Sequence, residues 1–190
     1  MTDFFSSETM PWLAGALVVV LLAMVWFFVG RPRTRLEQII NDISFDRVRN
    51  LVLPNADGGE ILIDQLLLTS QGLLILEIKD VQGTVFGSDK MQDWTVIAPS
   101  RRFTFPNPQP GLYDRIAAVR EVVRDVPVTG RILFMDGAEF PKGVPGLVSG
   151  LDELLAEFGE KDPGTARVKV DSFMPQWERL KQRWLSGGRA

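Results

Sequence analysis

The sequence predicts an α/β (α+β) domain preceded by a single transmembrane helix, and three observations lead to this fold class. Residues Pro11 to Val29 form an uncharged apolar run. Two shorter apolar runs between Ile61 and Lys79 have the composition of buried strands joined by a turn. Apolar residues then recur at helical spacing from Leu112 to Arg124, before another apolar run. The 190 residues are enough for one folded domain with an appendage.

The apolar run PWLAGALVVVLLAMVWFFV, at Pro11 to Val29, has the length of a membrane span. At 1.5 Å per residue it covers roughly 28 Å, close to the hydrocarbon thickness of a bilayer. Trp12 and Trp26 stand near its two ends, where interfacial aromatic residues are common. A buried core helix would show a polar stripe, and a signal peptide would begin with basic residues rather than with Asp3 and Glu8.

Three arginines follow this run directly, which predicts the orientation of the helix. Arg31, Arg33 and Arg35 are expected to stay on the cytoplasmic side by the positive-inside rule. We therefore expect a single-pass protein of the inner or plasma membrane with its N-terminus outside. Residues 31–190 would lie in the cytoplasm.

The segment after the arginines predicts a helix and a strand. Thr34 to Ile43 carries apolar residues at i, i+3, i+4 and i+7, the pattern of an amphipathic helix. Arg47 to Leu53 follows as a first strand, and Pro54 to Gly59 has the composition of a loop. The apolar helix positions are Leu36, Ile39, Ile40 and Ile43.

The two apolar runs from Ile61 to Lys79 contain the most informative charges of the chain. Asp64, Glu77 and Lys79 interrupt strands that are otherwise apolar, and a buried charge is costly unless it is paired or binds a metal. Glu77 and Lys79 are two residues apart on a strand, so they point to the same face.

The turn at Thr69 to Gly72 decides where Asp64 points. A two-residue loop at Ser70-Gln71 pairs position 64 with position 77, and one at Gln71-Gly72 pairs it with position 79. Either register places the carboxylates of Asp64 and Glu77 and the ammonium of Lys79 on one face of the sheet. A three-residue loop without a bulge would instead set Asp64 opposite Ile78, on the other face.

The second half of the chain predicts further short strands and three helices. We expect two short strands at the margin of the sheet, around Gly83 to Gly87 and at Trp94 to Ala98. Arg101 to Phe105 is basic and aromatic, which suits either a phosphate and base contact or, in the favoured interpretation, a solvated loop with a packed Phe. The remaining expected elements are a helix at Leu112–Arg124, a strand at Arg131–Met135, a loop at Ala138–Gly146, a helix at Gly150–Phe158, a strand at Val168–Val170 and a helix at Met174–Leu185.

Composition excludes several kinds of chemistry. The chain has no Cys, so it has neither disulfides nor thiolate metal sites, and no His, so imidazole catalysis and histidine metal motifs are absent. Catalysis would have to use carboxylates, lysine, hydroxyls or an oxygen-bound metal. The net charge of −3 and a pI near 5.1 are not typical of a nucleic-acid-binding protein, which is usually basic.

A joint pattern of residues resembles a known family. It consists of Asp64 before an apolar strand, Ser70-Gln71-Gly72, the run Leu74 to Lys79 containing Glu-x-Lys, the run Gly83 to Gly87, Trp94, and Asn107-Pro108 before a helix. Together with the element order, this pattern resembles the nuclease-related domain (NERD) family of the PD-(D/E)xK nuclease superfamily. The resemblance covers roughly Leu36 to Asp136 and implies a restriction-endonuclease-like mixed sheet flanked by helices.

The resemblance also implies a site. Asp64 and Glu77 would bind Mg²⁺ or Mn²⁺, Lys79 would orient or activate the attacking water, and Glu37 on the first helix would assist. Two positions depart from the family pattern. Gln65 stands where the family usually has a histidine, and Gly111 stands where members often have a glutamine.

We expect four segments: residues 1–10 outside the membrane, 11–30 as the transmembrane helix, 31–136 as the nuclease-related core and 137–190 as an extension of the same domain. The expected function is a membrane-anchored, Mg²⁺-dependent phosphodiesterase acting on DNA or RNA. One alternative is an inactive nuclease-like module that binds nucleic acid or a protein partner as a scaffold. A purely structural alternative makes Asp64, Glu77 and Lys79 an internally satisfied ion cluster.

Overall fold

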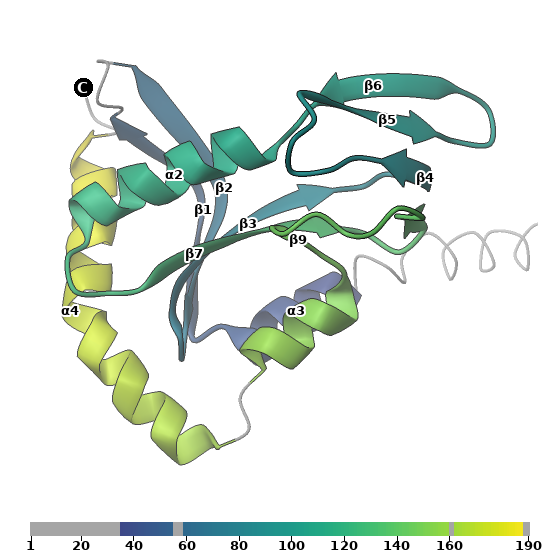
Figure 1. Cartoon of the computed structure of the whole chain (residues 1–190). Coiled ribbons are helices and arrows are strands. Elements are labelled where there is room, and N and C mark those ends of the chain that lie inside the picture. Colours follow the sequence, from purple (N-terminus) through teal and green to yellow (C-terminus); the bar gives the residue numbers. More distant parts are fainter. Residues whose placement is uncertain (1–34, 55–58, 160–161, 188–190) are drawn as a thin grey trace, which may run out of the picture. The chain divides into compact units, whose positions relative to one another are not determined.

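The computed structural model describes residues 35–54, 59–159 and 162–187 (Figure 1). The chain divides into two units, Met1–Gln38 and Ile39–Ala190. Residues 35–43 are helical, as predicted, and Ile39, Ile40 and Ile43 are buried. The predicted transmembrane helix at 11–29 lies outside the described residues.

Among the residues that the structure describes, no helix is long and apolar enough to cross a membrane.

The first sheet is mixed, as expected from the family resemblance. Its strand order is β1-β2-β3-β7-β9. Neighbours β1, β2 and β3 run antiparallel, whereas β3, β7 and β9 run parallel. The strands are β1 Asp46–Pro54, β2 Glu60–Thr69, β3 Gly72–Lys79, β7 Val128–Phe134 and β9 Val148–Ser149.

The strands predicted at the margin of this sheet form a second sheet instead. Its order is β6-β5-β4-β8, with β4 Gly83–Phe86, β5 Asp93–Ile97, β6 Arg102–Pro106 and β8 Ala138–Glu139. The prediction of a solvated loop at Arg101 to Phe105 was therefore wrong, because most of this segment is strand β6. Phe103 and Phe105 pair opposite Val96 and Trp94 and are half-buried, because alternation places both phenylalanines on one face of β6.

Three further helices are α2 Gln109–Val122, α3 Leu151–Phe158 and α4 Pro163–Gly187. Figure 1 shows α2 and α3 on opposite sides of the first sheet. The strand predicted at Val168–Val170 was wrong, because these residues continue α4. Val170 joins the core together with Trp177 and Leu180 of the same helix, so packing overrides the strand preference of valine.

Helices on both faces explain why β2 and β3 are apolar almost throughout. Leu66 and Leu68 of β2 and Leu73 and Ile75 of β3 share a core with Leu112, Ile116 and Val119 of α2. The alternate residues Leu67, Leu74 and Leu76 point to the other face and are also buried. Gly130 of β7 allows α2 this approach, since a Cβ there would lie 2.8 Å from Leu112 Cδ1.

The β2–β3 turn takes the first of the two predicted registers. Thr69 pairs with Gly72, which leaves Ser70 and Gln71 as the two-residue loop. The Thr69 hydroxyl donates a hydrogen bond to the carbonyl of Gly72 at 2.9 Å. Gly72 has φ of +122°, and a Cβ there would lie 2.3 Å from the carbonyl oxygen of Pro127. The turn therefore requires glycine at this position.

Strand alternation breaks next to Asp64. The core contains Val48 and Leu51 of β1, although residues three apart on a regular strand point to opposite faces. Between them Asn50 adopts φ of +53°, and the residue pairs of β1 and β2 skip Asn50 and Asp64. Asp64 thus lies at a local irregularity rather than on a regular stretch of strand.

Candidate functional site

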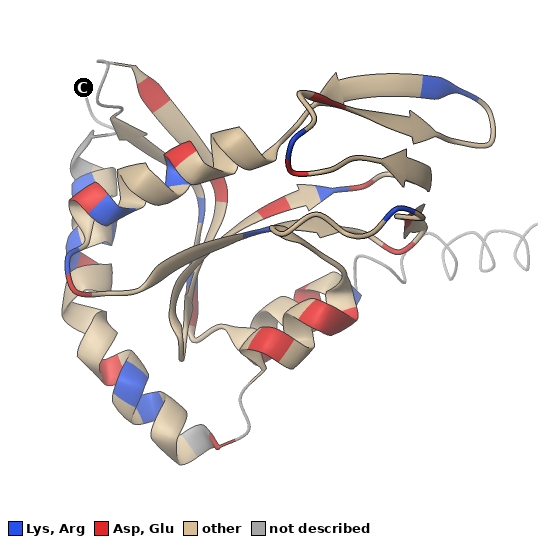
Figure 2. Cartoon of the chain, viewed as in Figure 1, with Lys and Arg blue, Asp and Glu red and all other residues tan. Residues whose placement is uncertain are grey.

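The carboxyl end of β3 carries an acidic and a basic side chain in contact. Glu77 Oε1 lies 2.7 Å from Lys79 Nζ, and the two side chains are 12% and 31% exposed. The prediction that they share a face is therefore confirmed. Figure 2 shows charged residues near this end of β3, whereas the preceding residues, Gly72 to Leu76, are uncharged.

A residue that was not predicted, Arg115, completes this group from α2. Its Nη1 lies 3.4 Å from Glu77 Oε2, and its Nε donates a hydrogen bond of 2.9 Å to the carbonyl of Leu62 on β2. Both oxygens of the Glu77 carboxylate therefore face a cation. One arginine links α2 to the two strands that carry the predicted site.

Gly111 is the sequence signal that could have pointed to Arg115. It lies one helical turn before Arg115, and helical side chains lean toward the helix N-terminus. A Cβ at Gly111 would lie 3.1 Å from Arg115 Nη1. A side chain at position 111 would therefore extend into the space next to the Arg115 guanidinium. Position 111 is also one of the two positions where the chain departs from the family pattern.

Asp64 lies on the neighbouring strand and is exposed to solvent. The observed β2–β3 pairs end at Gln65 opposite Leu76, and the same register continued by one residue sets Asp64 opposite Glu77. The structure thus joins Glu77, Lys79 and Arg115 by contact, whereas the β2–β3 pairs stop one residue before Asp64. The approach of the Asp64 carboxylate to Glu77 stays a prediction.

The residue after Asp64 carries a buried polar atom without a partner among the described residues. Gln65 Oε1 is buried and accepts no hydrogen bond from any residue that the structure describes. Such an atom costs roughly 1–3 kcal/mol, so its presence calls for an explanation. Because Gln65 pairs with Leu76, the residue next to Glu77, it points to the other face of the sheet and lies apart from the charged group.

The donor chemistry of this group suits a hard divalent cation. In the described part of the chain, no group of three or more Asp, Glu, His or Cys is arranged to hold a metal ion. Mg²⁺, however, commonly takes only one or two protein carboxylates and fills its other positions with water and phosphate. Asp64 and Glu77 match that requirement by number and by type. Glu37 belongs to the unit Met1–Gln38, and its assisting role stays a prediction.

Side chains around the start of α2 fix the helix that carries Arg115. Asn107 Nδ2 donates to the carbonyl of Met91 at 2.9 Å, and its Oδ1 accepts from the backbone N–H of Gln109 at 3.0 Å. The buried Gln109 in turn accepts a hydrogen bond from the backbone N–H of Leu147 at 3.2 Å. The N–H of Gly146 and the side chain of Gln109 hold the pKa of Asp89 below its usual range.

Comparison with protein families gives one match. The family model NERD, nuclease-related domain, matches residues 33–135. That range includes the contact group Glu77, Lys79 and Arg115, and it also includes the predicted site residues Glu37 and Asp64. No curated protein and no solved structure matches the chain.

Proposed function

Because the chain belongs to the nuclease-related domain family, we propose that it is a Mg²⁺-dependent phosphodiesterase acting on nucleic acid. In this proposal residues 11–30 anchor the protein in a membrane and residues 31–136 form the cytoplasmic core, extended by 137–190. The observation that carries the proposal is the position of Glu77, between Lys79 and Arg115 at the end of β3. A carboxylate beside two cations at a partly exposed strand end suits a metal-bound phosphate.

Each side chain of the site has a role in this proposal, and the contacts of Glu77, Lys79 and Arg115 support theirs. Asp64 and Glu77 would hold Mg²⁺, which when bound polarises a phosphoryl group and lowers the pKa of a bound water. The Lys79 ammonium has three N–H donors, of which Glu77 takes one, so it can also orient a water or a phosphate oxygen. Arg115 fixes the direction of the Glu77 carboxylate and adds positive charge where the phosphate would lie.

Calorimetric titration of the full chain with Mg²⁺ tests this function. The wild type is expected to show a binding site that Asp64→Asn loses, while Asp171→Asn on α4 serves as a control with the same change of charge. Nucleic-acid cleavage with Mg²⁺ or Mn²⁺ should disappear in Lys79→Met. If the wild type neither binds the metal nor cleaves nucleic acid, the proposed phosphodiesterase function is excluded.

A second candidate is a nuclease-like module that binds nucleic acid or a protein partner without turnover. One observation favours it: both oxygens of Glu77 already face cations of the chain itself, Lys79 and Arg115. Such a module would bind with an affinity that does not change on chelation of divalent cations. The same titration separates the two candidates.

A further inference from the structure

A cavity of about 650 Å³ lies at the carboxyl ends of the parallel strands β7 and β9. Its lining includes Phe134 and Met135 at the end of β7, Val148 and Ser149 of β9, and Glu153 in the first turn of α3. In open α/β sheets ligands bind outside the carboxyl ends of the strands. The volume also falls within the range of roughly 300–1,000 Å³ that is typical of small-molecule sites.

This cavity begins one strand away from Lys79. Lys79 pairs with Phe134 in the parallel β3–β7 ladder, and the backbone N–H of Met135 donates to the carbonyl of Lys79 at 3.0 Å. Adjacent strands are about 4.8 Å apart. The cavity wall at Phe134 is therefore one strand spacing from the backbone of Lys79.

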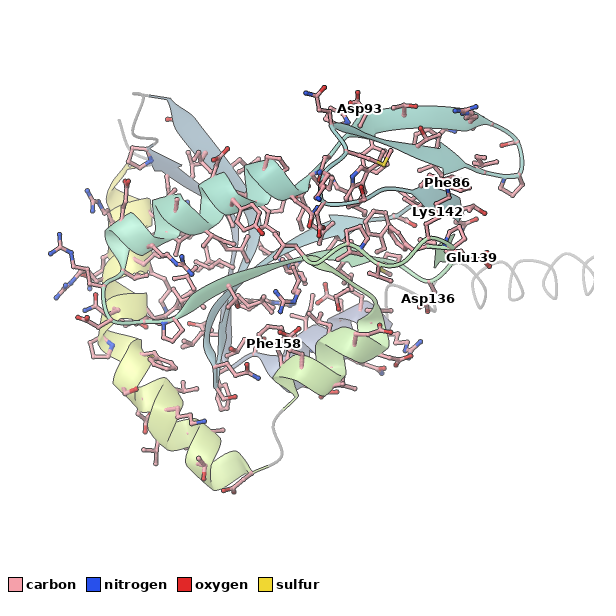
Figure 3. The ribbon with its side chains drawn as sticks, viewed as in Figure 1. Phe86, Asp93, Asp136, Glu139, Lys142 and Phe158 are labelled. Carbon is pink, nitrogen blue, oxygen red and sulfur yellow. The ribbon has the colours of Figure 1, made fainter. Side chains whose placement is uncertain are left out.

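The chemistry of the lining selects the kind of group that can enter. Phe134, Met135, Phe140 and Val148 supply apolar surface, and Asp136 and Glu153 supply carboxylates. Of the described residues that line the cavity, none is Lys or Arg. Figure 2 shows acidic and no basic residues on α3, and Figure 3 shows Asp136, Glu139 and Lys142 at the same end of the structure. Such a lining repels phosphate and favours a flat apolar ring that carries N–H donors.

We propose that the cavity holds an unpaired nucleobase, attached to the phosphodiester that lies at Lys79 and Arg115. This inference rests on the proposed function and extends it by naming the substrate class, a single-stranded or frayed nucleic acid. Glu153 accepts a hydrogen bond from the base, which favours cytosine, adenine and guanine, because their exocyclic amino groups are donors, over thymine, whose one donor on the unpaired base is the ring N3–H. A base within a duplex cannot reach the cavity unless it leaves the stack.

Binding of short single strands to the full chain tests this proposal without requiring cleavage. The probes are oligo-dC, oligo-dA, oligo-dT and an abasic strand of the same length, which keeps the phosphates and lacks the bases. The wild type should bind oligo-dC and oligo-dA more tightly than the other two strands. Glu153→Gln should weaken binding of oligo-dC by about tenfold, as expected for the loss of one hydrogen bond to a charged group.

The matched control is Glu121→Gln, which makes the same substitution at an exposed position of α2, outside the cavity lining. It should leave the preference for oligo-dC unchanged. Equal affinity of the wild type for all four strands would overturn the base pocket while leaving the phosphate site in place. Failure to bind any strand would instead overturn the proposed function, and the pocket with it.

Discussion

Arg115 Nη1 lies 3.4 Å from Glu77 Oε2, although the two residues are 38 positions apart in the sequence. The arginine comes from α2 and the glutamate from β3, so the contact exists only because α2 packs across the sheet. It joins the predicted Glu77–Lys79 pair to a third charged residue. The orientation of Glu77 thus depends on the helix as well as on its own strand.

Replacing Arg115 should weaken both stability and activity. Arg115→Ala removes the contact with Glu77 and the hydrogen bond to Leu62, and because the arginine is partly exposed we expect a loss of about 1–2 kcal/mol in the free energy of unfolding. Arg115→Lys should not restore cleavage, since an ammonium cannot make both contacts as the planar guanidinium does. Urea denaturation and cleavage rates measure the two effects.

The control for Arg115 is Arg124→Ala, which removes an exposed arginine just after the end of α2. Its free energy of unfolding should change by less than about 0.5 kcal/mol. Full activity in Arg115→Ala would contradict the role given to the arginine.

Asp64→Asn should separate metal binding from stability. Asp64 is exposed, so without Mg²⁺ its replacement should change the free energy of unfolding by no more than about 0.5 kcal/mol. With Mg²⁺ at a hundred times its dissociation constant, the wild type should gain about 2.7 kcal/mol and the variant nothing. Thermal melts with and without Mg²⁺ make this comparison, and an equal gain in both proteins would exclude Asp64 as a ligand.

Asp46 should make the fold sensitive to acid. Burial opposes ionisation of Asp46, but the hydrogen bonds from Lys181 and from the Trp177 indole, each 2.8 Å long, outweigh it and hold the pKa of Asp46 below its usual range. Because the pKa of Asp46 is lower in the folded state, its ionised carboxylate stabilises the fold, and this contribution is fully present above the unfolded-state pKa near 3.8. That stability is lost as the pH falls through the pKa that Asp46 has in the folded state.

The variant Asp46→Asn should lose this part of the pH dependence. Near neutral pH it should cost about 1 kcal/mol or less, because the Asp46 side chain is 41% exposed and the ion pair is screened by solvent. Denaturation curves at pH 7 and at acidic pH measure both effects, with Asp171→Asn on α4 as the control. Parallel pH profiles for Asp46→Asn and the wild type would show that the ion pair does not contribute.

Gly130→Ala should disturb the contact between β7 and α2. The added methyl would lie 2.8 Å from Leu112 Cδ1 and 3.0 Å from Ile116 Cδ1, so the helix or its side chains must shift. Overpacking of this kind costs about 1–3 kcal/mol. The same substitution at Gly59, where a Cβ would meet nothing within 4 Å, provides the comparison in denaturation experiments.

The sequence by itself determined the β2–β3 hairpin, its possible registers and the shared face of Glu77 and Lys79. It also determined α2 and β7, because apolar spacing within one element directly reports which residues that element buries. The Ser70-Gln71 loop was one of three possibilities, beside a loop at Gln71-Gly72 and a three-residue loop, and packing decided among them, since Gly72 lies against the backbone of Pro127.

Only the tertiary structure decided the rest. The second sheet, the helical state of Val168–Val170 and the partnership of Arg115 with Glu77 all depend on residues far apart in the chain. A local pattern gives the face that an element buries, but it does not give the element that covers this face. The site therefore required the packed fold, because its charges come from β3 and α2 and meet only where the helix crosses the sheet.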